Sequence, residues 1–206
     1  RRKEHGVYLR RRGEEFVVSR KPTQLGPIAS RRHASLAARV LSSCTPEEVD
    51  RLLQDGPLPR LRARLSRLAD DQRYEEAARL RDRVEALEQI VERLRTLERL
   101  RKLEVCLIAP MTEPGWRKAF FVCGGSVCAV RALPPGAGAG LEVGAGVALC
   151  RAARDQDEEP LSPEQAENLL LIDGFVRRPP PELAVLPLEA DRITLHLART
   201  QVPRAA

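Results

Sequence analysis

The chain is poor in aromatic residues, which make up 3% of its 206 residues and include one Trp and two Tyr. Hydrophobic residues still reach 43%, so its cores must be built mostly from Leu, Val and Ala. No apolar run approaches the ~20 residues that cross a bilayer, which excludes a transmembrane helix. The first residues, Arg1-Arg2-Lys3-Glu4-His5, lack the apolar stretch of a signal peptide. We therefore expect a cytoplasmic protein with no membrane partner.

Five cysteines and three histidines are scattered along the chain. The three histidines lie far in sequence from the cysteines, and no pair of cysteines forms Cys-x-x-Cys. This spacing argues against a zinc site and favours buried, reduced thiols. We expect no metal, no cofactor and no small-molecule substrate for this chain. The five cysteines are Cys44, Cys106, Cys123, Cys128 and Cys150.

The net charge of +6 is unevenly distributed. Residues 1–45 hold eleven basic and three acidic residues, whereas residues 104–206 are weakly acidic. A basic segment of this kind is typical of a phosphate-binding surface. Arg richness beside abundant Ala, Gly and Pro is also typical of a GC-rich genome, and that alternative stays open. The candidate DNA-binding residues are Arg10, Arg11, Arg12, Arg20, Lys21, Arg31 and Arg32.

Two amphipathic patterns in the middle of the chain predict an antiparallel pair of helices. Leucines recur at spacings of three and four over residues 58–68, and a second apolar stripe covers residues 77–94. Asp70 and Asp71 interrupt the pattern where a turn is needed. We expect Tyr74 to fill the tip of this hairpin and the exposed side of the hairpin to seek another hairpin. A short coiled coil with no partner is the alternative.

The second helix of this pair carries a more specific pattern. Residues 74–84 read Tyr-Glu-Glu-Ala-Ala-Arg-Leu-Arg-Asp-Arg-Val. They resemble the UVR motif of the excision-repair proteins UvrB and UvrC, which reads aromatic-Glu-x-Ala-Ala-x-Leu-Arg-Asp-x-aliphatic. The resemblance implies docking onto a UvrB-like hairpin or onto a second copy of this one. The partner-binding residues that it implies are Tyr74, Glu75, Ala77, Ala78, Leu80, Arg81, Asp82 and Val84.

The residues before the hairpin predict local structure and extend the resemblance. Residues 7–10 and 15–18 favour two short strands, and Ser30 is placed to cap a helix over 31–41. Thr45, Pro46 and Glu48 form a capping box for a further helix that ends by residues 55–57. Residues 25–32, Leu-Gly-Pro-Ile-Ala-Ser-Arg-Arg, are similar to a segment that follows the catalytic module in UvrC-like GIY-YIG nucleases.

That order of segments resembles the actinobacterial proteins in which a DEDD exonuclease is fused to a UvrC-like GIY-YIG module. The resemblance implies a C-terminal fragment whose nuclease core lies upstream, with residues 1–20 joining the end of that core to the segment at 25–32. Residues 6–9, Gly-Val-Tyr-Leu, permit another alignment, with the opening strand of a GIY-YIG domain. The Tyr-x-Gly-Lys that should follow that strand is absent. Neither alignment assigns a catalytic residue to this chain, and whether it belongs to an enzyme is left open.

The C-terminal part predicts strands and one further helix. Residues 105–109 favour a buried strand, and residues 119–123 and 127–130 favour a hairpin around Gly124-Gly125. We expect residues 134–146 to be a flexible linker and residues 155–159 a solvated acidic loop. Ser162 should cap a helix ending near residue 174, with a short strand before the prolines at 179–181.

The whole pattern predicts an α+β fold that is mainly helical, with the hairpin between two small domains. The expected parts are an N-terminal α/β remnant (1–44), a helix with the UVR hairpin (45–104) and an α+β domain (105–206). The expected function is that of a DNA-repair fragment, similar to nucleotide excision repair, that binds DNA and a partner. One alternative is the non-catalytic part of a full-length nuclease. Another is a UVR adaptor in protein quality control or stress regulation.

Overall fold

The computed structural model describes residues 6–54, 56–153 and 159–201. Within those ranges the chain forms seven helices and six strands, which confirms the predicted α+β class. It divides into two compact units, one of residues 1–97 with 159–166 and one of residues 98–158 with 167–206. The boundaries between the units fall inside two helices, α4 and α6.

Unit 1 begins with a two-stranded antiparallel ribbon. Strand β1 (Tyr8–Arg12) pairs with β2 (Glu15–Ser19) around a turn in which Gly13 has a φ of 64°. A left-handed φ at this place suits glycine, which has no Cβ to clash. Tyr8 enters the core, where its hydroxyl donates to the Leu161 carbonyl oxygen at 2.7 Å. The prediction of two short strands is therefore confirmed.

Two capped helices follow the ribbon. Helix α1 (Arg31–Leu41) starts where the Ser30 hydroxyl accepts a hydrogen bond from the His33 amide, as predicted. Helix α2 (Pro46–Asp50) starts with the predicted capping box between Thr45 and Glu48. It ends earlier than the predicted residues 55–57, because the chain turns after Asp50 and brings Leu52 into the core.

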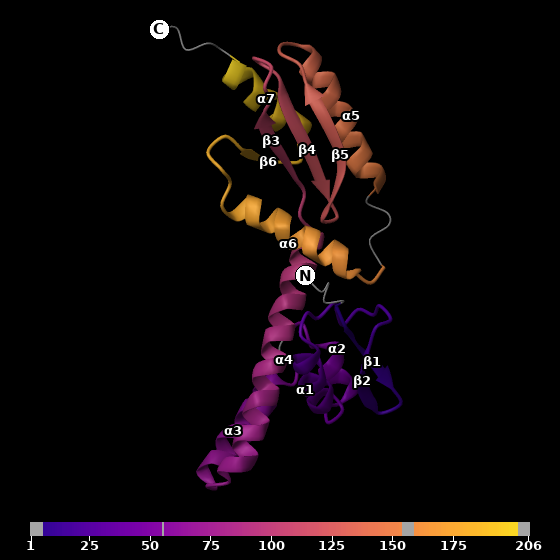
Figure 1. The fold of residues 1–206 in the computed structure, drawn as a ribbon, viewed down its shortest axis with the longest axis vertical. Helices are drawn as coiled ribbons and strands as arrows, with labels where there is room; N and C mark the ends of the chain where they lie inside the picture. Colours follow the sequence, from indigo (N-terminus) through magenta and orange to yellow (C-terminus); the bar gives the residue numbers. More distant parts are fainter. Residues whose placement is uncertain (1–5, 55, 154–158, 202–206) are drawn as a thin grey trace. The chain divides into compact units, whose positions relative to one another are not determined.

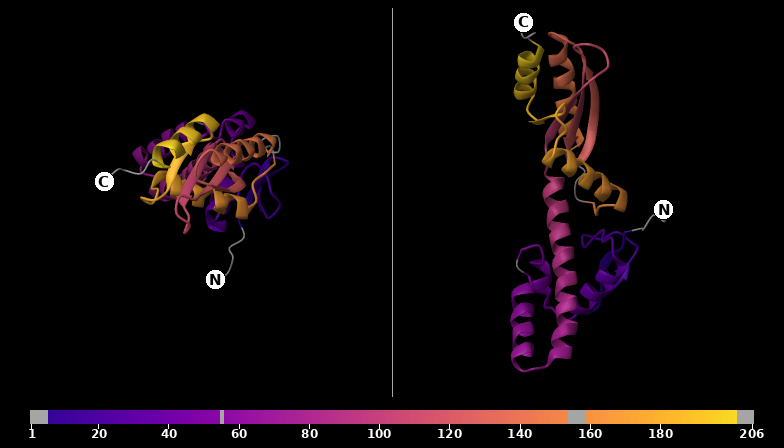
Figure 2. Two further views of the ribbon diagram at one scale, coloured as in Figure 1. Left: turned by 90° about the horizontal axis from the view of Figure 1, so that it is seen from above. Right: turned by 60° about the vertical axis from the view of Figure 1, so that its left-hand side comes forward.

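The predicted helical hairpin is present as α3 (Leu58–Asp70) and α4 (Tyr74–Arg101). The two helices run side by side and join at a tight turn, seen at the foot of the right-hand view in Figure 2. Helix α4 buries the whole predicted stripe on residues 77–94. On α3, Leu65 is half-buried while the other leucines of the stripe are buried.

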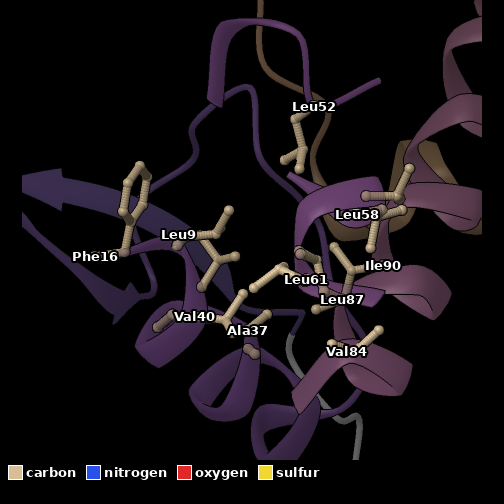
Figure 3. Packing of buried hydrophobic residues seen from close by; sticks show 14 of the residues in the cluster. Leu9, Phe16, Ala37, Val40, Leu52, Leu58, Leu61, Val84, Leu87 and Ile90 are labelled. Atoms are coloured by element: carbon tan, nitrogen blue, oxygen red, sulfur yellow. The ribbon is translucent and has the colours of Figure 1, made fainter. Parts of the chain in front are cut away.

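The N-terminal segment covers the apolar side of this hairpin. One hydrophobic cluster joins residues of the ribbon and α1 to residues of both hairpin helices. Figure 3 shows Leu61 and Leu87 of the hairpin turned toward Leu9, Ala37 and Val40. The expectation that this hairpin exposes a side in need of another hairpin is therefore wrong for its apolar side. That side is already buried within unit 1.

Unit 2 is built on a four-stranded antiparallel sheet with the order β5-β4-β3-β6. Its strands are β3 (Val105–Pro110), β4 (Arg117–Cys123), β5 (Ser126–Leu133) and β6 (Ala184–Pro187). Gly124 and Gly125 have φ angles of 59° and 75° at the β4–β5 turn, as a type I′ hairpin requires. The predicted strand over 105–109 and the predicted hairpin are both confirmed.

Helices cover both faces of the sheet (Figure 1). Helices α5 (Gly138–Ala153) and α7 (Ala190–Gln201) pack on the face that carries Cys106, Ile108 and Phe121. Helix α6 (Pro163–Arg177) places Ile172 against the opposite face, which carries Val105, Leu107 and Val122. The alternation follows from the two-residue period of a strand.

The C-terminal part corrects three expectations. The linker predicted over 134–146 is wrong, because α5 occupies most of it and buries Ala139, Val143 and Val147 on the sheet. Helix α6 continues to Arg177, beyond the predicted end near 174. The strand expected before the prolines instead follows them as β6. Most of the predicted acidic loop, residues 155–158, lies outside the described residues.

Candidate partner and nucleic-acid interface

The tip of the hairpin is closed by backbone hydrogen bonds. The Gln72 amide donates to the Ala69 carbonyl at 3.0 Å, and the Arg73 amide donates to the Leu68 carbonyl at 2.9 Å. These two bonds form a Schellman motif, and Gln72 takes the left-handed conformation that the motif needs, with φ of 60°. The Arg73 side chain then binds the Glu76 carboxylate at 2.9 and 2.7 Å. The tip is therefore a defined turn with charged side chains around it.

The UVR-like residues divide into a buried and an exposed group. Ala77, Leu80 and Val84 are buried in the core of unit 1, so their part in the motif is structural. Ala78 is half-buried, so of the two adjacent alanines only Ala77 is buried. The exposed members, which remain accessible in this chain, are Tyr74, Glu75, Arg81 and Asp82.

Tyr74 does not fill the tip, and that prediction is wrong. Its side chain is 66% exposed at the first position of α4, because the Schellman turn already closes the hairpin. Among the described residues of unit 1, it is the only large apolar side chain that is exposed. Tyr is one of the side chains enriched where protein interfaces gain most of their binding energy, so Tyr74 is a candidate anchor.

The exposed charges beside the tip are only loosely paired. Arg81 lies 3.9 Å from the Asp82 carboxylate and 3.9 Å from the Glu85 carboxylate. Arg62 makes a closer bridge from α3 to Glu88 on α4, at 2.6 Å. Exposed pairs contribute about 0–1 kcal/mol each, and loose ones less, so Arg81 can exchange its acidic neighbours at little cost.

All seven candidate DNA-binding residues are exposed, and none forms an ion pair within the described part of the chain. They lie in three places. Arg10, Arg11 and Arg12 occupy the end of β1 next to the Gly13 turn. Arg20 and Lys21 follow β2 at the opposite end of the ribbon. The third place is the first turn of α1, which holds Arg31 and Arg32 and has no acidic residue.

Three further arginines, outside the seven candidate DNA-binding residues, line a hollow of about 220 Å³ in unit 1. They are Arg64 on α3 and Arg79 and Arg83 on α4. Arg79 and Arg83 are one helical turn apart on α4, so they share a face of that helix. Their approach to Arg64 depends on how the two helices pack.

Two buried thiols of unit 2, Cys106 and Cys150, are poor nucleophiles. Burial raises the pKa of Cys106 to about 12, and burial followed by the neighbouring Cys128 raises the pKa of Cys150 to about 12. Since the thiolate is the reactive form, neither is a nucleophile near neutral pH. All five cysteines are free of disulfide bonds. Cys106, Cys123 and Cys150 are buried as predicted, whereas Cys44 and Cys128 are only half-buried.

Within the residues that are described, no group of three or more His, Cys, Asp or Glu side chains is arranged to hold a metal ion. Over the same residues, no helix combines the length and the apolar character needed to cross a bilayer.

Comparison with known proteins identifies the hairpin. The family model described as the UvrB/uvrC motif (UVR) matches residues 56–90, which are α3, the tip and the first part of α4. No curated protein and no solved structure matches the chain. The UVR resemblance read from residues 74–84 is therefore confirmed, and this chain contains a UVR motif folded as a helical hairpin.

Proposed function

We propose that this chain is a docking module of a DNA-repair system, with its UVR hairpin bound to a matching hairpin of a UvrB-like protein or of a second copy. One observation carries the proposal. The UVR match at residues 56–90 falls on a hairpin whose tip exposes Tyr74, the one large exposed apolar side chain among the described residues of unit 1.

The burial pattern supports a division of labour within the motif. Ala77, Leu80 and Val84 pack in the core of unit 1, so they stabilise the fold and are not available to a partner. Tyr74 supplies apolar area for a partner, and Arg81 with Asp82 supplies exchangeable charge next to it. An interface of this kind is anchored by the aromatic side chain and made selective by the charges.

DNA contact is the second part of the proposal. The seven exposed cations, Arg10 to Arg12, Arg20, Lys21, Arg31 and Arg32, would bind phosphates without reading sequence. We also propose that the chain is related to UvrC-like GIY-YIG nucleases and to their fusions with exonucleases. The proposed domains of the chain are residues 1–44, 45–104 and 105–206. No nuclease step is assigned to any residue of this chain.

The docking proposal is tested with Tyr74→Ala and Arg81→Glu. Both side chains are exposed, so circular dichroism should show an unchanged helix content. Sedimentation with a UvrB-type C-terminal hairpin should show association with the wild type and at least a tenfold weaker association with Tyr74→Ala, a loss of about 1.4 kcal/mol.

The matched control is Arg67→Glu, at another exposed arginine, on α3, that is not one of the implied partner-binding residues. Arg81→Glu should weaken association and Arg67→Glu should not. If both variants weaken association equally, the loss comes from net charge and not from the position of Arg81. Equal association of wild type and Tyr74→Ala would remove the tip from the interface.

DNA binding is tested separately by its dependence on salt. Each phosphate contact on duplex DNA contributes a slope of about −0.9 in log K against log salt. Changing Arg31 and Arg32 to Ala should flatten the slope by roughly two if both touch phosphate. Partner binding without any DNA binding would favour the adaptor in protein quality control over the repair module.

A further inference from the structure

The hollow in unit 1 lies where the end of α1 meets both helices of the UVR hairpin. Its floor is apolar but already buried: Leu61, Leu68 and Leu80 are each at most 7% exposed. An apolar side chain from a partner would therefore find little new apolar surface to cover. The part of the hollow that a ligand can reach is its polar rim.

That rim is dominated by guanidinium groups. Arg64, Arg79 and Arg83 line it, together with a single acidic side chain, Glu76. The Glu76 carboxylate is already engaged by both ends of the Arg73 guanidinium, at 2.9 and 2.7 Å. It therefore offers only partial compensation to the three cations of the rim.

The three rim arginines have donors to spare. Arg79 reaches the exposed Glu75 carboxylate at 3.5 Å, which is a weak pair. Neither Arg64 nor Arg83 takes part in an ion pair within the described residues. Arg83 is half-buried, and an anion that meets it there interacts more strongly than it would in open water.

The chemistry of the rim selects an oxyanion. A guanidinium presents paired donors that match the oxygens of a phosphate, and several guanidiniums around one hollow can share one phosphate. Unit 1 also carries the basic segment 1–45, so its field favours a polyanion over an isolated acidic side chain. A phosphodiester of nucleic acid meets both conditions.

We propose that the hollow between α1, α3 and α4 binds a backbone phosphate of nucleic acid through Arg64, Arg79 and Arg83. The inference rests on the DNA-binding part of the proposed function and moves a main contact from the N-terminal arginines to the UVR hairpin itself. It places the DNA site and the exposed tip with Tyr74 on the same helical hairpin, so that binding of DNA can change the affinity for the partner.

The test compares arginines inside the hollow with arginines outside it. The double variant Arg64→Gln/Arg83→Gln removes two rim cations. The control variant Arg62→Gln/Arg67→Gln removes two exposed cations of α3 that neither line the hollow nor belong to the implied partner-binding residues. Fluorescence anisotropy with labelled duplex and single-stranded oligonucleotides gives the affinity at several salt concentrations. Circular dichroism checks that both variants keep the fold.

The hollow variant should flatten the salt slope on duplex DNA by about one, because one phosphate contact is lost, and weaken binding roughly tenfold at low salt. The control variant should keep the wild-type slope. Equal slopes for both variants would overturn the inference while leaving DNA binding intact. A wild type that binds no DNA would overturn the DNA-binding proposal and this inference together. A hollow variant that loses the partner hairpin but keeps the DNA slope would show that the hollow takes an acidic side chain of a protein.

Discussion

Shortening one side chain of the N-terminal ribbon should destabilise the UVR hairpin. Leu9 lies on β1, is 1% exposed, and belongs to the same hydrophobic cluster as Leu61 and Leu87 of the hairpin (Figure 3). The Leu9 amide donates to the Leu25 carbonyl, and its carbonyl accepts from the Thr23 hydroxyl. Leu9→Ala keeps both backbone bonds and removes only the packed side chain.

The expected magnitude follows from that burial. Replacing a fully buried Leu by Ala costs about 2–5 kcal/mol, from lost apolar burial and from the cavity left behind. A loss of about 3 kcal/mol in a unit of about 100 residues lowers the melting temperature by roughly 10–20 °C. It also lowers the urea midpoint by about 1–3 M.

Circular dichroism at 222 nm is the right assay, because most helical residues of unit 1 belong to α3 and α4. The single tryptophan, Trp116, lies in unit 2, so its fluorescence follows the other unit in the same titration. Arg11→Ala is the matched control on the same strand, since its side chain is exposed and its removal should change stability by less than about 0.5 kcal/mol. If Leu9→Ala and Arg11→Ala unfold with the same midpoint at 222 nm, the core shared by the ribbon and the hairpin is refuted.

Four other substitutions test packing inside each of the two units. In α5, Gly146→Ala should destabilise unit 2 in urea titrations because a Cβ would collide with the Phe121 ring, while Gly144→Ala meets no neighbour and should stabilise the helix by about 0.5–1 kcal/mol. Burial raises the pKa of Cys106 to about 12 in the folded state, from an ordinary 9.0, so between these values the folded state keeps a proton that the unfolded state releases. The free energy of unfolding of unit 2 should therefore fall as the pH rises from 9 to 12. Cys106→Ala should remove that part of the pH dependence in urea titrations. Tyr8→Phe removes a buried hydroxyl that donates at 2.7 Å and leaves a carbonyl unsatisfied, which should cost unit 1 about 1–3 kcal/mol in thermal melts.

The local features of the chain were readable from its sequence because they depend on near neighbours. Ser30 and Thr45 cap their helices as predicted, since a side-chain oxygen needs only an amide three residues away. Gly124 and Gly125 form the predicted turn for the same kind of reason. The UVR hairpin belongs with them, because its stripes and its break lie within about 40 consecutive residues.

The structure of residues 134–153 depended on contacts far away in sequence. A run of Gly, Ala and Pro has the composition of a linker, and its first residues indeed turn at Gly136 with φ of 84°. The following residues become α5 because the sheet needs its apolar face covered, and Gly146 allows the helix to approach Phe121. Only the sheet supplies that reason, and three strands of it precede the helix in the chain.

The same distinction governs the candidate site. The sequence by itself determined that a UVR hairpin exists and which residues fill its motif, because a helix repeats its faces every three to four residues. It did not determine that Tyr74 stands free, that the ribbon and α1 cover the apolar side, or that Arg64 joins Arg79 and Arg83 around one hollow. Those outcomes were decided by the tertiary structure. Side chains of separate elements meet only where the faces of those elements pack together, and the spacing of residues along one helix or strand does not determine which faces pack.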